Sequence, residues 1–292
     1  MKVLVTGSSG RVGRAIYVRL CREHEVVGLD QLPSSTADIV GDIADTALLK
    51  RALRGADAVV HTAALHAPHV GIVPDAQFER INVQATRDLA NLAVQAGATR
   101  FVFTSTTALY GSAATPGAKA GWVDESLAPQ PKTVYHRTKL AAEALLEVIS
   151  REATLAVTSL RMSRCFPEPA PVMAVYRLHR GVDARDVAEA HALALESASS
   201  GFRKFVISGA TPFRIEDAEG LAGNAPAVLE HRAPELVEAF VRRGWRLPKA
   251  IDRVYSPMLA MRELGWRPRH DFREVLKMLD EGSSEVLPPR NH

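Results

Sequence analysis

Tyr135 and Lys139 are the residues whose types and spacing point most directly to proton transfer. Positions four apart share one face of a helix, and this pair opens an alanine-rich segment that we predict to be helical to Ser150. A phenol has a pKa of about 10, and a neighbouring ammonium favours the phenolate, which can take a proton from a hydroxyl. Because the spacing is common by chance, the alternative is a surface Tyr and Lys on an amphipathic helix.

Hydroxyl side chains cluster at the end of the predicted strand 100–105, in the sequence Thr104-Ser105-Thr106-Thr107. In α/β folds, ligands bind at the carboxyl ends of parallel strands. Either Thr106 or Ser105 could therefore hold a substrate oxygen by a hydrogen bond.

Glycines at positions 7, 10 and 13 lie between an apolar β-branched run at 2–6 and a segment at 11–23 with helical spacing. In such a turn the first glycine permits the tight bend, the second admits a pyrophosphate, and the third lets the helix pack on the strand. The phosphates would lie at the helix N-terminus, where unpaired N–H groups favour negative charge. The pattern predicts a dinucleotide site, and the alternative is a tight turn in an ordinary α/β protein.

Asp30 ends the second predicted strand, and Gln31, Leu32 and Pro33 follow it rather than Arg or Lys. A carboxylate at this place accepts hydrogen bonds from ribose hydroxyls and repels a 2′-phosphate, which favours NAD over NADP. Arg11 could still contact a phosphate, so NADP stays open. With NAD bound, a Tyr135 phenolate could take a hydroxyl proton while hydride leaves the same carbon.

The remaining cofactor candidates follow the predicted strands. The full predicted set is Gly7, Ser9, Gly10, Arg11, Val12, Gly13, Asp30, Asp42, Ile43, Thr62, Ala63, Ala64, Asn82, Tyr135 and Lys139. Asp42 is equally well explained as a cap for the next helix or turn. His66 lies with His69 in a loop that we expect near the substrate, and no metal is expected because no Cys or carboxylate set accompanies them.

Length and composition indicate an ordinary globular protein. The chain has 292 residues, 24% of them charged and a net charge of +3, which does not favour nucleic acid as a partner. Cys21 and Cys165 make neither a disulfide framework nor a metal site, and Cys21 is expected to be buried in the first helix. With no signal peptide and no apolar run long enough for a membrane, we expect a cytoplasmic protein.

Alternating strands and helices predict a doubly wound parallel sheet, the Rossmann fold, with a small C-terminal substrate-binding part. We place the NAD-binding domain at 1–162 and the substrate-binding part at 163–292, with 182–208 returning to the sheet.

Taken together, these features resemble the extended short-chain dehydrogenase/reductases of the NAD-dependent epimerase/dehydratase family. The matching positions are 6–13, 30, 41–42, 61–64, 82 with 86, 105–111, 135–139, 161, 182–188 and 264–268. The resemblance implies that Tyr135 is the catalytic acid/base and that Lys139 tunes it. It also implies that Thr106 is the hydroxyl partner, with Ser105 as second choice.

The chain departs from the nucleotide-sugar members of that family. Arg164 stands where they usually carry an asparagine, no Gly-Pro pair follows, and the segment before Asp183 is short. The stretch LRMSRCFPEP at 160–169 is instead similar to uronate dehydrogenases, which use an arginine to grip a substrate carboxylate. Arg177 is the best candidate for that role, with Arg164 and Arg180 behind it, and a solvated basic face is the alternative.

We therefore expect an NAD-dependent oxidoreductase of carbohydrate metabolism that acts on a sugar or sugar-acid hydroxyl. A nucleotide-sugar epimerase without net redox change and a non-catalytic dinucleotide sensor are the alternatives. Relatives in this family commonly dimerise, which here would use the helices at 75–96 and 137–150.

Overall fold

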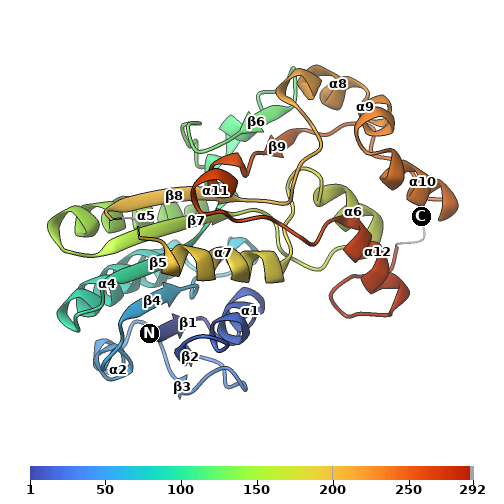
Figure 1. The fold of residues 1–292 in the computed structure, drawn as a ribbon. Helices are drawn as coiled ribbons and strands as arrows, with labels where there is room; N and C mark the ends of the chain where they lie inside the picture. Colours follow the sequence, from blue (N-terminus) through green and yellow to red (C-terminus); the bar gives the residue numbers. More distant parts are fainter. Residues whose placement is uncertain (199, 290–292) are drawn as a thin grey trace. The chain divides into compact units, whose positions relative to one another are not determined.

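The computed structural model describes residues 1–198 and 200–289. Its main element is a mostly parallel seven-stranded sheet in the order β3-β2-β1-β4-β5-β7-β8 (Figure 1). The strands are β1 (Lys2–Thr6), β2 (Glu25–Asp30), β3 (Ile39–Val40), β4 (Ala58–His61), β5 (Arg100–Thr106), β7 (Ala156–Met162) and β8 (Phe202–Ile207). The predicted doubly wound α/β fold is confirmed.

Strand β1 lies where the order of the sheet reverses, because β2 flanks it on one side and β4 on the other. Its last residue, Thr6, pairs in register with Leu29 of β2 and His61 of β4. The chain leaves β1 directly into the glycine-rich turn, so this turn lies at the place where doubly wound sheets bind ligands.

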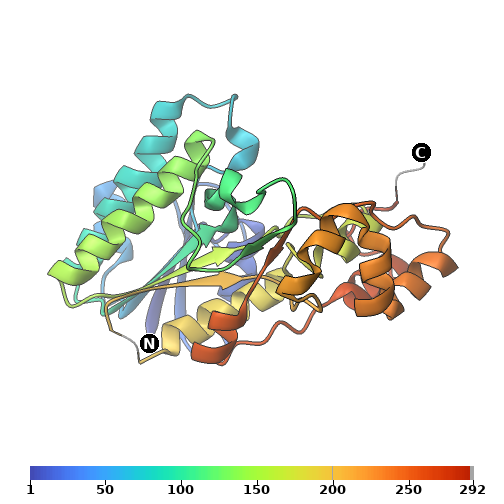
Figure 2. The ribbon, with the colours of Figure 1, turned by 90° about the horizontal axis from the view of Figure 1, so that it is seen from above.

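Helices cover both faces of the sheet, as Figure 2 shows from above. They are α1 (Arg11–Leu20), α2 (Thr46–Ala52), α3 (Asp75–Phe78), α4 (Ala85–Gln95), α5 (Val134–Glu152) and α7 (Ala184–Glu196). α2, α4 and α5 pack together on one face, and α7 lies on the other, where Glu189 forms an ion pair with Arg19 of α1 (2.6 Å). Apolar residues of the strands and of α2, α4 and α5, among them Leu4, Phe101 and Leu146, form the core on the first face.

The helix predicted at 75–96 differs from the prediction in one respect. Residues Glu79–Gln84 form a π-helical segment between α3 and α4, and it contains the buried Asn82. Such a widened turn is typical of functional sites in helices.

A second compact unit comprises residues 110–130, 162–186 and 206–292, whereas 1–109, 131–161 and 187–205 form the first. Segment 110–130 thus lies in the second unit, with β6 (Gly121–Val123) pairing in parallel with β9 (Arg253–Tyr255). The other elements of this unit are α6 (Ala170–Tyr176), α8 (Ala218–Gly223), α9 (Ala225–Arg232), α10 (Pro234–Arg242), α11 (Met258–Glu263) and α12 (Phe272–Asp280). Short 3-10 turns occupy Ala67–His69, Thr107–Tyr110, Ser112–Ala114 and Ile215–Asp217.

The predicted burial of Cys21 is wrong. Helix α1 ends at Leu20, so Cys21 is the C-cap residue and its side chain is exposed. The apolar face of the helix is completed by Gly13, Ile16 and Leu20, which leaves no core position for the thiol. Across the described parts of the chain, none of the helices combines the length and apolarity that crossing a bilayer requires.

Candidate active site

The glycine-rich turn is shaped by close backbone approaches. Gly7 has φ +73°, and an added Cβ would lie 2.5 Å from Thr62 Oγ1, while a Cβ on Gly13 would lie 2.0 Å from the Gly7 carbonyl. A Cβ on Gly10 would meet only that same carbonyl, at 3.3 Å. The protein itself therefore excludes side chains at Gly7 and Gly13, whereas the outer side of Gly10 is left open for a ligand to approach.

Helix α1 begins at this turn without a side-chain cap on its N-cap residue, Gly10. Uncapped first-turn amides and the helix dipole favour an anion such as a phosphate. The open cradle at Gly10 and the uncapped helix therefore fit the pyrophosphate of a dinucleotide. Arg11 and Val12, both predicted cofactor contacts, lie in this first turn.

Asp30 faces the same turn. Its carboxylate accepts hydrogen bonds from the backbone N–H of Ser9 (3.0 Å) and of Leu32 (2.9 Å), which leaves further lone pairs for ribose hydroxyls. A chain of hydroxyls from Ser9 through Ser34 to Thr36 closes back on the carbonyl of Ser8. Ser34 and Thr36 were not predicted, since only the folded loop brings them to the glycine-rich turn.

Asp42, one of the predicted cofactor contacts, makes hydrogen bonds within the protein. One oxygen accepts the N–H of Ala44 (2.9 Å) and the other the Arg80 guanidinium (2.8 Å). Ile43 is buried in the core, so its backbone is the part left for a ligand. Arg80 was also missed, because it lies 38 positions away in the π-helical segment.

Tyr135 and Lys139 lie on the first turns of α5, whose N-cap Thr133 accepts the N–H of His136. Burial raises the pKa of Tyr135 to about 12, and a hydrogen bond with the Thr106 side chain opposes that rise. The structure thus brings together Tyr135 and Thr106, as the sequence suggested. Ser105 precedes Thr106 in β5, and its Oγ is buried with no hydrogen-bond partner among the described residues.

Lys139 contacts strand β5. Burial lowers the pKa of Lys139 to about 7, and its Nζ donates to the Thr104 carbonyl (2.8 Å) and lies 4.4 Å from the centre of the Phe103 ring. Because the pKa of Tyr135 is raised, the phenol is protonated at neutral pH in this structure. The predicted phenolate would require additional positive charge beside it.

Two of the predicted cofactor contacts make hydrogen bonds within the protein. Thr62, next to Ala63 and Ala64 after β4, donates its hydroxyl to the Thr6 carbonyl (2.7 Å). Asn82 is 1% exposed, and its amide bridges both backbone groups of Leu65 at 2.8 Å. Thr62 thus joins the loop after β4 to the end of β1, and Asn82 joins the π-helical segment to the loop at Leu65.

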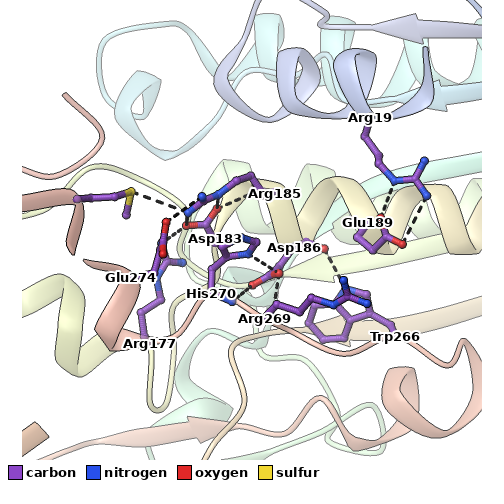
Figure 3. Close-up of polar contacts among 11 residues, drawn as sticks. Arg19, Arg177, Asp183, Arg185, Asp186, Glu189, Trp266, Arg269, His270 and Glu274 are labelled. Atoms are coloured by element: carbon purple, nitrogen blue, oxygen red, sulfur yellow. Dashed lines mark hydrogen bonds and ion pairs between the residues drawn. The ribbon is translucent and has the colours of Figure 1, made fainter. Parts of the chain in front are cut away.

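The predicted substrate arginines lie in the second unit. Arg177 is 2% exposed and donates to Asp183 (2.9 Å), which also binds Arg185, itself paired with Glu274 (Figure 3). A guanidinium neutralised in this way is not available to a substrate carboxylate, so the choice of Arg177 over Arg164 is not supported by its environment.

Arg164 and Arg180, the two other candidates, are more accessible. Arg164 is exposed, pairs with Glu168 and lies over the Phe166 ring (5.5 Å). Arg180 pairs with Asp252 (3.5 Å) and lies over the Tyr176 ring (4.8 Å).

His66 is exposed and lies against His69 with ring centres 4.7 Å apart. Its backbone N–H donates to His69 Nδ1 (3.0 Å), and its own Nδ1 lies 3.1 Å from the Ala64 carbonyl. The only group of three metal-ligand side chains found in the described residues is Glu23, His24 and Glu196, so neither loop histidine belongs to one.

Comparison with known proteins identifies the family. The model of the NAD dependent epimerase/dehydratase family matches residues 3–170. The chain belongs to this family. The match spans β1, the glycine-rich turn and the Tyr135–Lys139 helix, and NAD is the cofactor of the family.

Individual curated relatives share about 30% sequence identity with this chain over part of its length. A protein of Bacillus subtilis described as an uncharacterized UDP-glucose epimerase is 29% identical over 61% of this chain and 61% of its own length. An L-arabinose 1-dehydrogenase (NAD(P)(+)) of Haloferax volcanii is 30% identical over 55% of this chain and 66% of its own. The chain thus spans less than two thirds of the length of these curated relatives.

The fold is shared over nearly the whole chain. A UDP-glucose-4-epimerase from Stenotrophomonas maltophila, solved with bound NAD and formylated UDP-arabinopyranose, superposes with a TM-score of 0.72. It is 24% identical and covers 95% of this chain and 96% of its own.

Proposed function

We propose that this protein is an NAD-dependent oxidoreductase that removes hydride from a hydroxyl-bearing carbon of a sugar or sugar acid, with Tyr135 as acid/base. The observation that carries the proposal is the meeting of Tyr135 and Thr106 at the end of β5, in the same compact unit as the dinucleotide cradle. A family member without catalysis would not need a buried phenol hydrogen-bonded to a hydroxyl beside a buried lysine, which argues against a dinucleotide sensor.

Each side chain has a distinct part in the proton transfer. NAD, when bound, supplies the hydride acceptor. Thr106, with Ser105 as second choice, holds the substrate oxygen, and Tyr135 takes its proton or returns it. Since burial keeps the phenol protonated, Tyr135 is prepared to donate a proton to a carbonyl oxygen, and oxidation requires that it first lose one.

Lys139 supplies the charge that makes the loss of this proton easier. Its ammonium form lies in a buried place where a positive charge acts strongly. With a pKa of about 7, it is only partly protonated at neutral pH. Anything that restores its charge would therefore favour the phenolate.

Nucleotide-sugar epimerisation is the second candidate, and the relative in Bacillus subtilis favours it. An epimerase returns hydride to the same carbon and shows no net NADH. The dehydrogenase is favoured by the arabinose dehydrogenase relative.

The test is NADH absorbance after mixing the protein and NAD with free uronates, neutral aldoses and nucleotide sugars in separate wells. Net formation of NADH with one of these three classes of sugar supports a dehydrogenase and identifies the class of its substrate. Conversion of a nucleotide sugar without NADH supports the epimerase instead.

Tyr135→Phe tests the role of the phenol, because the substitution removes only the hydroxyl oxygen and keeps the ring. We expect turnover to fall by at least about 100-fold, since general acid–base catalysis contributes factors of this size, while the Kd for NAD changes little. Full turnover in this variant would remove Tyr135 from the mechanism.

A further inference from the structure

His61, the last residue of β4, lies inside a hydrogen-bonded chain that sequence reasoning did not find. It is 1% exposed, and its two ring nitrogens contact Thr6 Oγ1 (Nδ1, 2.6 Å) and Thr86 Oγ1 (Nε2, 2.9 Å). Thr6 immediately precedes the glycine-rich turn, and Thr86 follows the π-helical segment. One imidazole thus joins the end of β1, directly before the glycine-rich turn, to the first turn of α4.

The directions of these hydrogen bonds follow from the number of hydrogens that each hydroxyl and the imidazole can donate. The Thr86 hydroxyl donates its single hydrogen to the Asn82 carbonyl (2.8 Å), so the contact with His61 must be donated by Nε2. The ring is neutral, because burial lowers its pKa to about 3. Nδ1 is therefore an acceptor, and the Thr6 hydroxyl donates to it.

The same chain continues to the helix that carries the acid/base. Asn82 Nδ2 donates to Thr138 Oγ1 (3.2 Å), and the Thr138 hydroxyl donates to the Val134 carbonyl (2.9 Å). Thr138 lies between Tyr135 and Lys139 in sequence and is fully buried. Every link belongs to the first compact unit.

We propose that His61 is a positioning residue, which holds the turn after β1 and the first turns of α5 in one register so that bound dinucleotide and Tyr135 are aligned. This inference rests on the proposed function of Tyr135. Packing alone does not require an imidazole here. The ring lies 6.0 Å from Phe101 and 5.7 Å from Phe103 between ring centres, an environment that suits phenylalanine.

Three substitutions separate the two halves of the link. His61→Asn keeps an oxygen near Nδ1 for Thr6, His61→Gln keeps an N–H near Nε2 for Thr86, and His61→Phe removes both. Thr158→Val is the control, because Thr158 is also a buried strand residue of the same unit but belongs to no part of this chain of hydrogen bonds.

The first measurement is hydrogen exchange with and without saturating NAD. In the wild type we expect NAD to slow exchange both at residues 6–13 and at residues 134–139. In His61→Asn and His61→Phe the protection at 134–139 should be lost, and Thr158→Val should keep it. Equal protection of both segments in His61→Phe, or its loss in Thr158→Val, would overturn the proposal.

Kinetics and binding give the second measurement. We expect His61→Gln to weaken NAD binding about tenfold with a smaller change in kcat, and His61→Asn to lower kcat about tenfold with a smaller change in Kd, because each loses about one hydrogen bond. A purely structural His61 would lower Tm in all variants without this split, which would also count against the proposal.

The exchange experiment needs no substrate, so failure of the two proposals can be told apart. A wild type that binds NAD and protects both segments but oxidises and epimerises no sugar contradicts the proposed function alone. A wild type that does not bind NAD contradicts both.

Discussion

At the scale of single residues, the candidate site depends on how burial sets proton affinity. Tyr135 and Lys139 are both buried, and burial moves their pKa values in opposite directions, to about 12 and about 7. Each shift disfavours the charged form of its group. At neutral pH Tyr135 is therefore uncharged, whereas Lys139 is only partly charged.

Lys139→Met should reveal the cost of burying the ammonium. The unfolded lysine has a pKa near 10.5 and the folded one about 7, so the unfolded state binds more protons between these values and stability rises with pH across them. The free-energy cost of burying the charged Lys139 side chain is therefore largest below pH 7, and it vanishes above pH 10.5. We therefore expect the variant to gain stability relative to wild type at pH 7, by a few kcal/mol at most, and the gain to shrink by pH 10.

Urea unfolding of both proteins at pH 7, 8.5 and 10 measures this difference. A stability difference that is constant over this range would contradict the lowered pKa of Lys139.

Asp30→Asn should relax the preference for NAD. The amide oxygen can still accept from Ser9 or Leu32, but the negative charge that repels a 2′-phosphate is gone. We expect the ratio of the Kd values for NADP and NAD to fall about tenfold or more, an effect of roughly 1.4 kcal/mol. Fluorescence titration with both dinucleotides measures it, and an unchanged ratio would show that Asp30 does not read the ribose.

At the scale of elements, Gly13 and Gly10 are glycines of the same turn for different physical reasons. A Cβ at Gly13 collides with the Gly7 carbonyl at 2.0 Å, whereas at Gly10 the nearest atom is 3.3 Å away. Gly13 thus allows helix α1 to pack against the turn that precedes it. Gly10 leaves room for a ligand to approach that turn.

Gly13→Ala and Gly10→Ala should therefore fail differently. We expect Gly13→Ala to lower Tm strongly, because the backbone must shift. Gly10→Ala should lower Tm less, because the Gly7 carbonyl 3.3 Å away needs only a small shift, but it should bind NAD at least about tenfold more weakly. Thermal denaturation and NAD titration of the two variants test this. Normal NAD affinity in Gly10→Ala would argue against a pyrophosphate at this turn.

At the scale of the whole molecule, buried neutral histidines control stability in acid. Burial lowers the pKa of His61 and His179 to about 3 and that of His191 to about 4. In the unfolded chain these rings titrate near 6.5. Below that pH the unfolded state binds more protons than the folded state, so stability falls as the pH decreases toward 4.

We expect the free energy of unfolding to fall by about 3 kcal/mol between pH 7 and 5.5, roughly 1 kcal/mol for each ring. Urea titrations at these pH values measure it. His191→Gln should reduce the slope by about one third. A free energy that stays constant down to pH 5.5 would contradict neutral, buried rings.

The sequence by itself determined the sheet and the glycine-rich turn, and it pointed to Tyr135 and to the hydroxyls of Thr106 and Ser105 without deciding between these two. These depend on local signals: apolar strands, helical spacing and glycines required by backbone geometry, and each strand end delivers its polar residues to one edge of the sheet.

The tertiary structure alone decided which polar side chains are already bonded to other groups of the protein. Asp183 neutralises Arg177, Arg80 holds Asp42, and Thr6 and Thr86 fix the proton of His61. Partners such as Arg80 and Thr86 lie 38 and 25 positions away, and β6 meets β9 across more than a hundred residues. No periodicity encodes such pairings, because they form only when separate elements pack and burial makes each unpaired polar group costly.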